Sequence, residues 1–137
     1  MQMTPVIAIH LAAALGAIVT GPVALWARRS RQQRPRLHRA FGYAWVTLML
    51  VTATSAIFIR DYGLPNIAGY TPIHVLVPVT YIGLFFGLRF MLKGQVQAHR
   101  HTMTWTYVGA CLIAGAFTLL PARYLGRLVW GDWLGLL

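Results

Sequence analysis

The chain has 137 residues, of which 58% are hydrophobic and only 10% charged, whereas a soluble domain carries about 25% charged residues. Its two acids, Asp61 and Asp132, cannot give a soluble surface of mixed charge. The net charge of +10 comes largely from short basic segments beside apolar stretches, which argues against nucleic-acid binding. We therefore expect a single all-α domain over residues 1–137, embedded in a membrane.

Four apolar stretches follow one another along the chain, and each has the length of about 20 residues that a membrane-spanning helix needs. They run approximately over residues 5–27, 38–60, 72–92 and 102–122. Helices satisfy their own backbone within lipid, so the sequence predicts a bundle of four transmembrane helices. Small residues would let these helices approach closely, and the glycines among them are Gly16, Gly21, Gly83, Gly87, Gly109 and Gly115.

The basic residues predict the orientation of the chain. Six arginines lie in the first connection: Arg28, Arg29, Arg31, Arg34, Arg36 and Arg39. The third connection adds Arg89, Lys93 and Arg100, and the opposite side has Arg60, Arg123 and Arg127. Because positive loops stay in the cytoplasm, we expect both termini outside a bacterial inner membrane. We also expect the Arg28–Arg39 loop to bind anionic lipids, and the Trp- and Leu-rich tail to lie along the outer interface.

The two halves of the chain resemble each other. Ile9-His10 in the first half matches Ile73-His74 in the second, and His38-Arg39 matches His99-Arg100. The two histidines are 28 residues apart in the first half and 25 in the second. This pattern predicts a tandem-duplicated helical hairpin, with the copies related by an axis along the membrane normal.

The histidines then fall into two layers. At 1.5 Å per residue, His10 and His74 lie about 27 and 28 Å from the cytoplasmic edge. His38 and His99 lie at that edge, with His101 as an alternative to His99. Paired imidazoles on facing helices suit the two axial positions of a haem iron. The sequence therefore predicts one or two b-type haems, held by His10 with His74 and by His38 with His99.

Four arginines are candidate partners of the haem propionates, because guanidinium groups suit carboxylates. They are Arg39, Arg100, Arg60 and Arg123. Each is equally typical of an interfacial anchor, and single histidines also serve as interfacial or hydrogen-bonding residues. Copper bound with the help of Met3 or Met103 is a minor alternative. The single cysteine, Cys111, cannot form an intrachain disulfide, and we expect it to be a small packing residue.

Several stretches resemble a known bacterial family. "RPRLHRAFGYAW", "IHVLVPVTYIGLFFGLRFMLKGQVQAHRHTM" and "LLPARYLG" are similar to the small integral-membrane proteins known as domain of unknown function 2306. The matching motifs are His38-Arg39, His74 and the stretch from His99-Arg100 to Met103. The resemblance implies a polytopic bacterial membrane protein and no particular activity. The layered histidines are also similar, as an architectural analogy, to transmembrane di-haem cytochromes b.

Taken together, these features favour a membrane b-type cytochrome that transfers electrons between a quinol or another redox partner and a second redox protein. It would be an electron-transfer protein or redox subunit rather than a stand-alone enzyme, and a quinone is a further candidate ligand. The alternative is a non-catalytic accessory or assembly subunit of a larger respiratory or photosynthetic membrane complex. Paired histidines at two depths have no purpose in such a subunit, so they favour the cytochrome.

Overall fold

The computed structural model describes residues 3–29, 33–63 and 65–136, and over these ranges the chain is all-α, as expected. Its elements, in chain order, are α1 (Pro5–Arg29), α2 (Pro35–Phe58), the 3-10 turn η1 (Pro72–Val75), α3 (Leu76–Leu92), α4 (Val96–Tyr107), the π-helical segment η2 (Val108–Ile113), α5 (Ala114–Thr118), α6 (Tyr124–Arg127) and the π-helical segment η3 (Leu128–Trp133). In the described part of the chain, the one strand-like feature is an isolated bridge between Ile67 and Tyr70.

Three helices of the described chain are long and apolar enough to cross a membrane: Pro5–Arg29, Pro35–Phe58 and Pro72–Leu92. They match the first three expected spans. The second begins three residues earlier than expected, because Pro35 is well placed in a first helical turn. The fourth expected span, 102–122, falls on a helical run from 96 to 118 that changes from α to π and back. No single helix in this run reaches the length of the other three.

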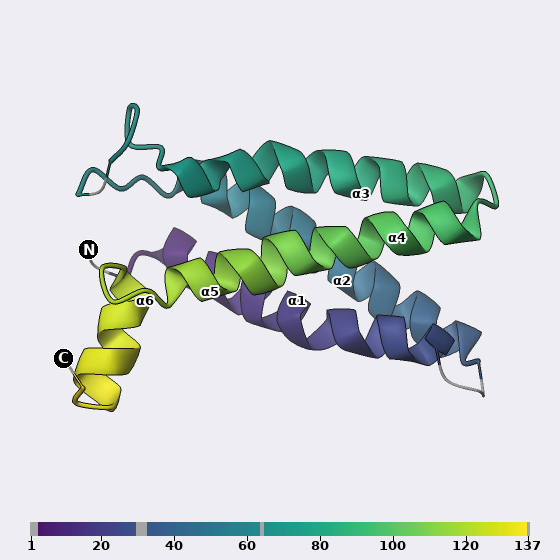
Figure 1. Ribbon diagram of the computed structural model, residues 1–137, viewed down its shortest axis with the longest axis horizontal. Coiled ribbons are helices and arrows are strands. Elements are labelled where there is room, and N and C mark those ends of the chain that lie inside the picture. Colours follow the sequence, from purple (N-terminus) through teal and green to yellow (C-terminus); the bar gives the residue numbers. More distant parts are fainter. Residues whose placement is uncertain (1–2, 30–32, 64, 137) are drawn as a thin grey trace.

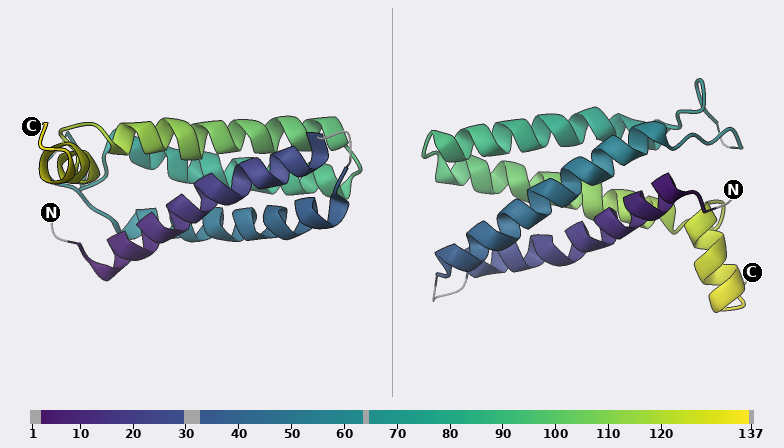
Figure 2. Two further views of the ribbon diagram at one scale, coloured as in Figure 1. Left: turned by 90° about the horizontal axis from the view of Figure 1, so that it is seen from below. Right: turned by 180° about the vertical axis from the view of Figure 1, so that it is seen from behind.

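The long helices form two hairpins, α1 with α2 and α3 with α4, and α2 also packs against α3 (Figures 1 and 2). The two hairpin turns lie at one end of the molecule, which we call the basic end because its connections carry the clustered arginines. The N-terminal segment, the 59–71 connection and the C-terminal segment lie at the other end, which we call the far end. Together, α6 and η3 lie across the far end (Figure 1), where Trp130 Nε1 donates a hydrogen bond to the Leu119 carbonyl (2.7 Å).

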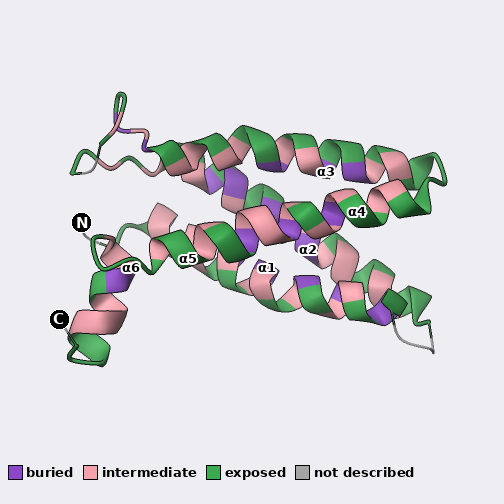
Figure 3. Ribbon diagram, in the orientation of Figure 1, coloured by how far each residue is buried: buried purple, intermediate pink, exposed green. Residues whose placement is uncertain are grey.

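Most of the buried residues lie in the seams between helices (Figure 3). The outward faces carry large apolar side chains. Phe58 is 69% exposed and Leu92 82% exposed, which suits contact with lipid and not with water. The central buried cluster contains Ala17, Trp45, Met49, Leu84, Met103, Tyr107 and Cys111. Its side chains come from both hairpins, so this cluster joins the two halves of the chain.

Only some of the expected glycines lie at close helix contacts. A Cβ at Gly83 would clash with the Thr106 hydroxyl of α4, and one at Gly87 would lie 2.7 Å from the Met103 methyl carbon. Gly21 makes room for the Tyr107 ring in the same way. Gly109 differs from the expectation, because a Cβ there would meet nothing within 4 Å.

Candidate functional site

His38 and His99 meet at the basic end of the molecule. Each is the fourth residue of its helix, α2 or α4, and each is partly buried. Their ring centroids are 6.3 Å apart and their planes are nearly perpendicular, at 86°. The sequence predicted this pair, and the structure brings these two residues together.

Both rings are held in the same way by the preceding helix. His38 Nδ1 lies 2.8 Å from the Ala24 carbonyl of α1, and His99 Nδ1 lies 2.8 Å from the Gly87 carbonyl of α3. A carbonyl only accepts, so these bonds assign the proton to Nδ1 in each ring. Nε2 of each neutral imidazole then keeps its lone pair. A backbone carbonyl on one nitrogen and a free lone pair on the other is the usual arrangement of a metal-binding histidine.

Further side chains of α2 meet those of α4 and η2 along the same seam. The meeting pairs, starting from the basic end, are His38 with His99, Trp45 with Tyr107, and Met49 with Cys111. The partners are 61, 62 and 62 positions apart in the sequence. A nearly constant offset means that α2 runs in the same direction as α4 and η2, and stays in register with them along this seam.

His10 lies towards the far end and contacts α2. Its Nδ1 lies 3.0 Å from the Thr52 carbonyl and 3.1 Å from Ser55 Oγ. The carbonyl assigns the proton to Nδ1, so Nε2 of His10 also keeps its lone pair. His74, the residue expected to pair with His10, lies in η1 at the same end of the molecule.

His74 differs from His10, His38 and His99 because both of its ring nitrogens form hydrogen bonds. The Thr71 backbone N–H donates to Nδ1 (3.1 Å), as part of a capping box at the start of η1. Nε2 therefore carries the proton and donates to the Ile59 carbonyl (2.8 Å). His74 thus ties the start of α3 to the end of α2. A metal between His10 and His74 would require His74 to give up one of these bonds.

His101 does not take the place of His99. It is exposed on α4, and its nearest ring partner is Trp105 of the same helix, with centroids 6.2 Å apart. Among the described residues, no three His, Cys, Asp or Glu side chains gather into a metal-binding group. The pair of His38 and His99 has only two such side chains, so it is not a group of this kind.

The four candidate arginines divide between the two ends. Arg39 and Arg100 directly follow the paired histidines and are exposed at the basic end. Arg31, from the same loop, lies outside the described residues. Arg60 and Arg123 lie at the far end, and Arg123 is 4.0 Å from the Asp61 carboxylate.

Arg60 is held by its own connection. Its guanidinium donates to the Ala68 carbonyl and to the Tyr70 hydroxyl, both at 3.3 Å, and lies over the Tyr70 ring. A hydrogen bond with Tyr62 and the nearby tyrosines raise the pKa of Arg60, so the guanidinium stays charged at every accessible pH. These contacts fold the 59–71 connection back on itself.

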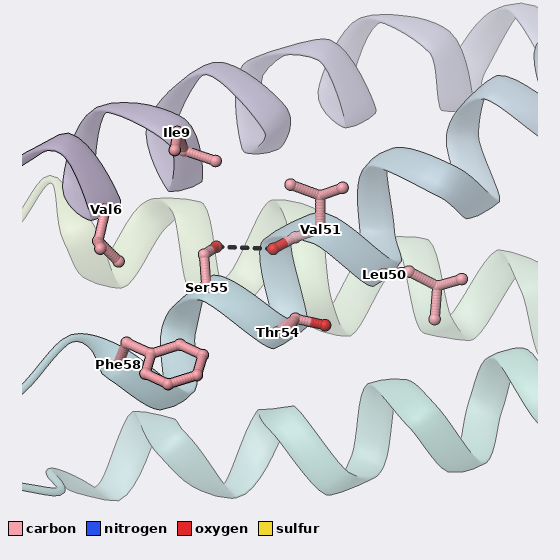
Figure 4. A pocket seen from close by; sticks show the side chains of 7 residues that line it. All are labelled: Val6, Ile9, Leu50, Val51, Thr54, Ser55 and Phe58. Carbon is pink, nitrogen blue, oxygen red and sulfur yellow. Dashed lines mark hydrogen bonds between the residues drawn. The ribbon is translucent and has the colours of Figure 1, made fainter.

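Two of the hollows on the described surface are lined by neither His38 nor His99. One, of about 370 Å³, lies between α1 and α2 and is lined by apolar side chains with Thr54 and Ser55 (Figure 4). The Ser55 hydroxyl there donates to the Val51 carbonyl (2.7 Å). The other, of about 720 Å³, lies beside the 65–78 segment at the far end. Both have mainly apolar linings, which suits lipid chains.

Sequence reasoning missed the sulfur-containing part of the seam, although a signal was present. His99, Met103, Tyr107 and Cys111 recur at intervals of four residues, which places them on one side of a helix. That spacing could have shown that the histidine and the cysteine share a face.

A comparison with protein families agrees with these features. The family model described as predicted membrane protein (DUF2306) matches residues 7–130. The chain belongs to this family. It is therefore a membrane protein, and the resemblance noted in its histidine motifs is confirmed. Neither the search of curated proteins nor the search of solved structures finds a match.

Proposed function

We propose that this family member is a membrane b-type haem protein in which His38 and His99 would hold the haem iron. The observation that carries the proposal is the separation of 6.3 Å between the two ring centroids. Two imidazoles bound to opposite sides of one metal ion, at metal–nitrogen distances of about 2 Å, have ring centres roughly 6 Å apart. An edge-to-face contact between rings has the same separation, so the argument also needs the orientation of the nitrogens.

The hydrogen bonds supply that orientation. Ala24 and Gly87 provide carbonyls to the two Nδ1 atoms, which leaves both Nε2 lone pairs for a metal. When bound, haem supplies reversible one-electron chemistry. The chain's own residues hold and orient it: the carbonyls fix the tautomers, and Arg39 and Arg100 are suited to pair with the propionates. The two rings are in edge-to-face contact and neither hollow reaches them, so α2 and α4 would have to separate to admit the macrocycle.

The proposal includes a duplicated hairpin and four membrane spans. Two observations support the duplication: the constant offset of 61–62 between facing residues of α2 and α4, and the equivalent bonds from His38 to α1 and from His99 to α3. A twofold-like axis along the membrane normal explains both. The helical run 96–118 then forms the fourth span, with η2 within it.

We propose one haem per chain and not two. His10 keeps a free Nε2, but His74 has both nitrogens engaged in joining η1 to the end of α2. A second haem between His10 and His74 would have to replace a hydrogen bond that closes the far end. His74 is better explained as a structural residue of that end.

The orientation and the partners form part of the same proposal. The basic end would face the cytoplasm, with its arginines against anionic lipid headgroups. The haem would then lie at the cytoplasmic edge of a bacterial inner membrane. A redox protein, a larger membrane complex or a quinone would supply the other half of the electron transfer.

The test is an optical spectrum of the detergent-purified chain, produced with an ample supply of haem. We expect sharp Soret and α bands on reduction and close to one haem b per chain. Two haems per chain would mean that His10 and His74 also bind haem. A colourless protein with the correct helical content would exclude the haem function and leave the accessory subunit, whose only specific support is the extent of exposed apolar surface on the long helices.

A further inference from the structure

A second cluster of possible metal ligands lies deeper in the α2–α4 seam, away from the paired histidines. Cys111 Sγ and Met49 Sδ are 3.5 Å apart. The two residues are 4% and 2% exposed, so both sulfur atoms are shielded from lipid and water. Met103, 9% exposed, belongs to the same buried cluster.

A polar group without an acceptor lies in the same buried cluster as this sulfur pair. Trp45 is 5% exposed, and its Nε1–H reaches no acceptor. Trp45 belongs to the same buried cluster as Met49 and Cys111. A buried N–H without an acceptor is destabilising, so its presence in an otherwise apolar cluster calls for a partner. A thiolate at Cys111 would be a much stronger acceptor for this N–H than a thiol.

The backbone is also irregular at this place. Cys111 lies inside η2, where the helix widens from α to π over Val108–Ile113. Such π-helical segments inside a longer helix are found frequently at functional sites. The segment also places Cys111 opposite Met49 in the seam between the hairpins.

We infer that Cys111 and Met49 form a binding site for a single monovalent copper ion. Thiolate and thioether sulfur are the ligands that select Cu(I). Binding exchanges the thiol proton for the metal: the S–H bond breaks, a Cu–S bond forms, and the proton leaves to solvent. No electron is transferred, and the thiolate and Cu⁺ together are neutral, which suits a buried position.

The geometry needs only a small adjustment. Metal–sulfur bonds of about 2.3 Å require the two sulfur atoms to move apart by roughly 1 Å. Methionine has three rotatable bonds and accommodates such changes readily. Trp45 would then donate its unpartnered N–H to the Cys111 thiolate. This site is independent of the haem proposal, because it shares no residue with His38 or His99.

The experiment titrates the full-length chain in detergent with Cu(I), kept reduced by ascorbate without oxygen, against a coloured Cu(I) chelator. We expect one Cu(I) per chain. Cys111→Ser should abolish this binding, and Met49→Leu should weaken it at least tenfold. Met91→Leu is the matched control, since Met91 is a methionine on the exposed surface of α3 (42% exposed), and it should bind as the unchanged protein does.

Two results would overturn the inference: no Cu(I) bound above the detergent blank, or equal binding by Cys111→Ser. If Cys111→Ser does not fold, Met49→Leu decides, because leucine and methionine replace each other with little cost. The haem spectrum of the same samples keeps the two proposals apart. Failure to bind copper with an intact haem spectrum rejects only the copper site, and copper binding by a colourless protein rejects only the haem.

Discussion

His38 and His99 have the same local surroundings, each in its own hairpin. Each lies in the first turn of the second helix of a hairpin, donates Nδ1–H to a carbonyl of the first helix, and is followed by an exposed arginine. A histidine that only anchored the chain at the interface would need neither the carbonyl nor its counterpart. The repetition of the whole arrangement is what favours a shared ligand.

Neighbouring histidines provide a test at the residue scale. We predict that His38→Ala or His99→Ala lowers haem retention at least tenfold, because each removes one of two axial ligands. His101→Ala should retain haem, because its ring is exposed beside Trp105 and away from His38. Haem content per chain after purification measures the effect. Equal loss in His99→Ala and His101→Ala would contradict the assignment.

At the scale of the helices, Gly83 lets α3 and α4 of the second hairpin pack closely against each other. We predict that Gly83→Ala destabilises the protein by about 1–3 kcal/mol, the usual cost of overpacking, because its methyl group would clash with the Thr106 side chain. That side chain is held by a hydrogen bond to the Thr102 carbonyl (2.8 Å). Thermal unfolding in detergent measures the change.

Gly109→Ala is the matched control for this substitution. It lies in the helical run 96–118, and a Cβ there meets nothing within 4 Å. The added methyl group should leave the unfolding temperature unchanged or raise it, since alanine is favoured over glycine within helices by about 0.5–1 kcal/mol. A similar loss of stability in both variants would mean that close packing at Gly83 does not position α4.

The helices also show how far sequence reasoning reaches. The first three apolar helices follow from length and apolar content, and the meeting of His38 with His99 was expected from the proposed internal repeat. The π-helical segment at 108–113 could not be predicted, because an apolar stretch of this kind is compatible with both α and π geometry. The engagement of both nitrogens of His74 also escaped prediction, because it depends on where the 59–71 connection brings the Ile59 carbonyl.

At the scale of the whole molecule, charge separates the two ends. Both acids, Asp61 and Asp132, lie towards the far end, and the charged side chains described at the basic end are arginines and a lysine. The positive-inside rule predicts that the basic end faces the cytoplasm. The same charge asymmetry predicts where anionic lipids gather.

Single cysteines introduced at the two ends test this orientation. We predict that Leu134→Cys, at the far end, reacts with a membrane-impermeant maleimide in intact bacteria, and that Gln33→Cys, at the basic end, reacts only after the cells are opened. Both positions are exposed, whereas Cys111 is buried and gives no background. The reverse labelling pattern would place the basic end outside and refute the proposed topology.

The central claim is that His38 and His99 share one haem iron, and electron paramagnetic resonance of the oxidised protein tests it most directly. The nearly perpendicular imidazole planes, at 86°, predict a low-spin ferric signal with strongly anisotropic g values. That signal should disappear in His38→Ala and in His99→Ala. A high-spin signal from singly ligated haem, or no haem signal in protein produced with ample haem, would contradict the account.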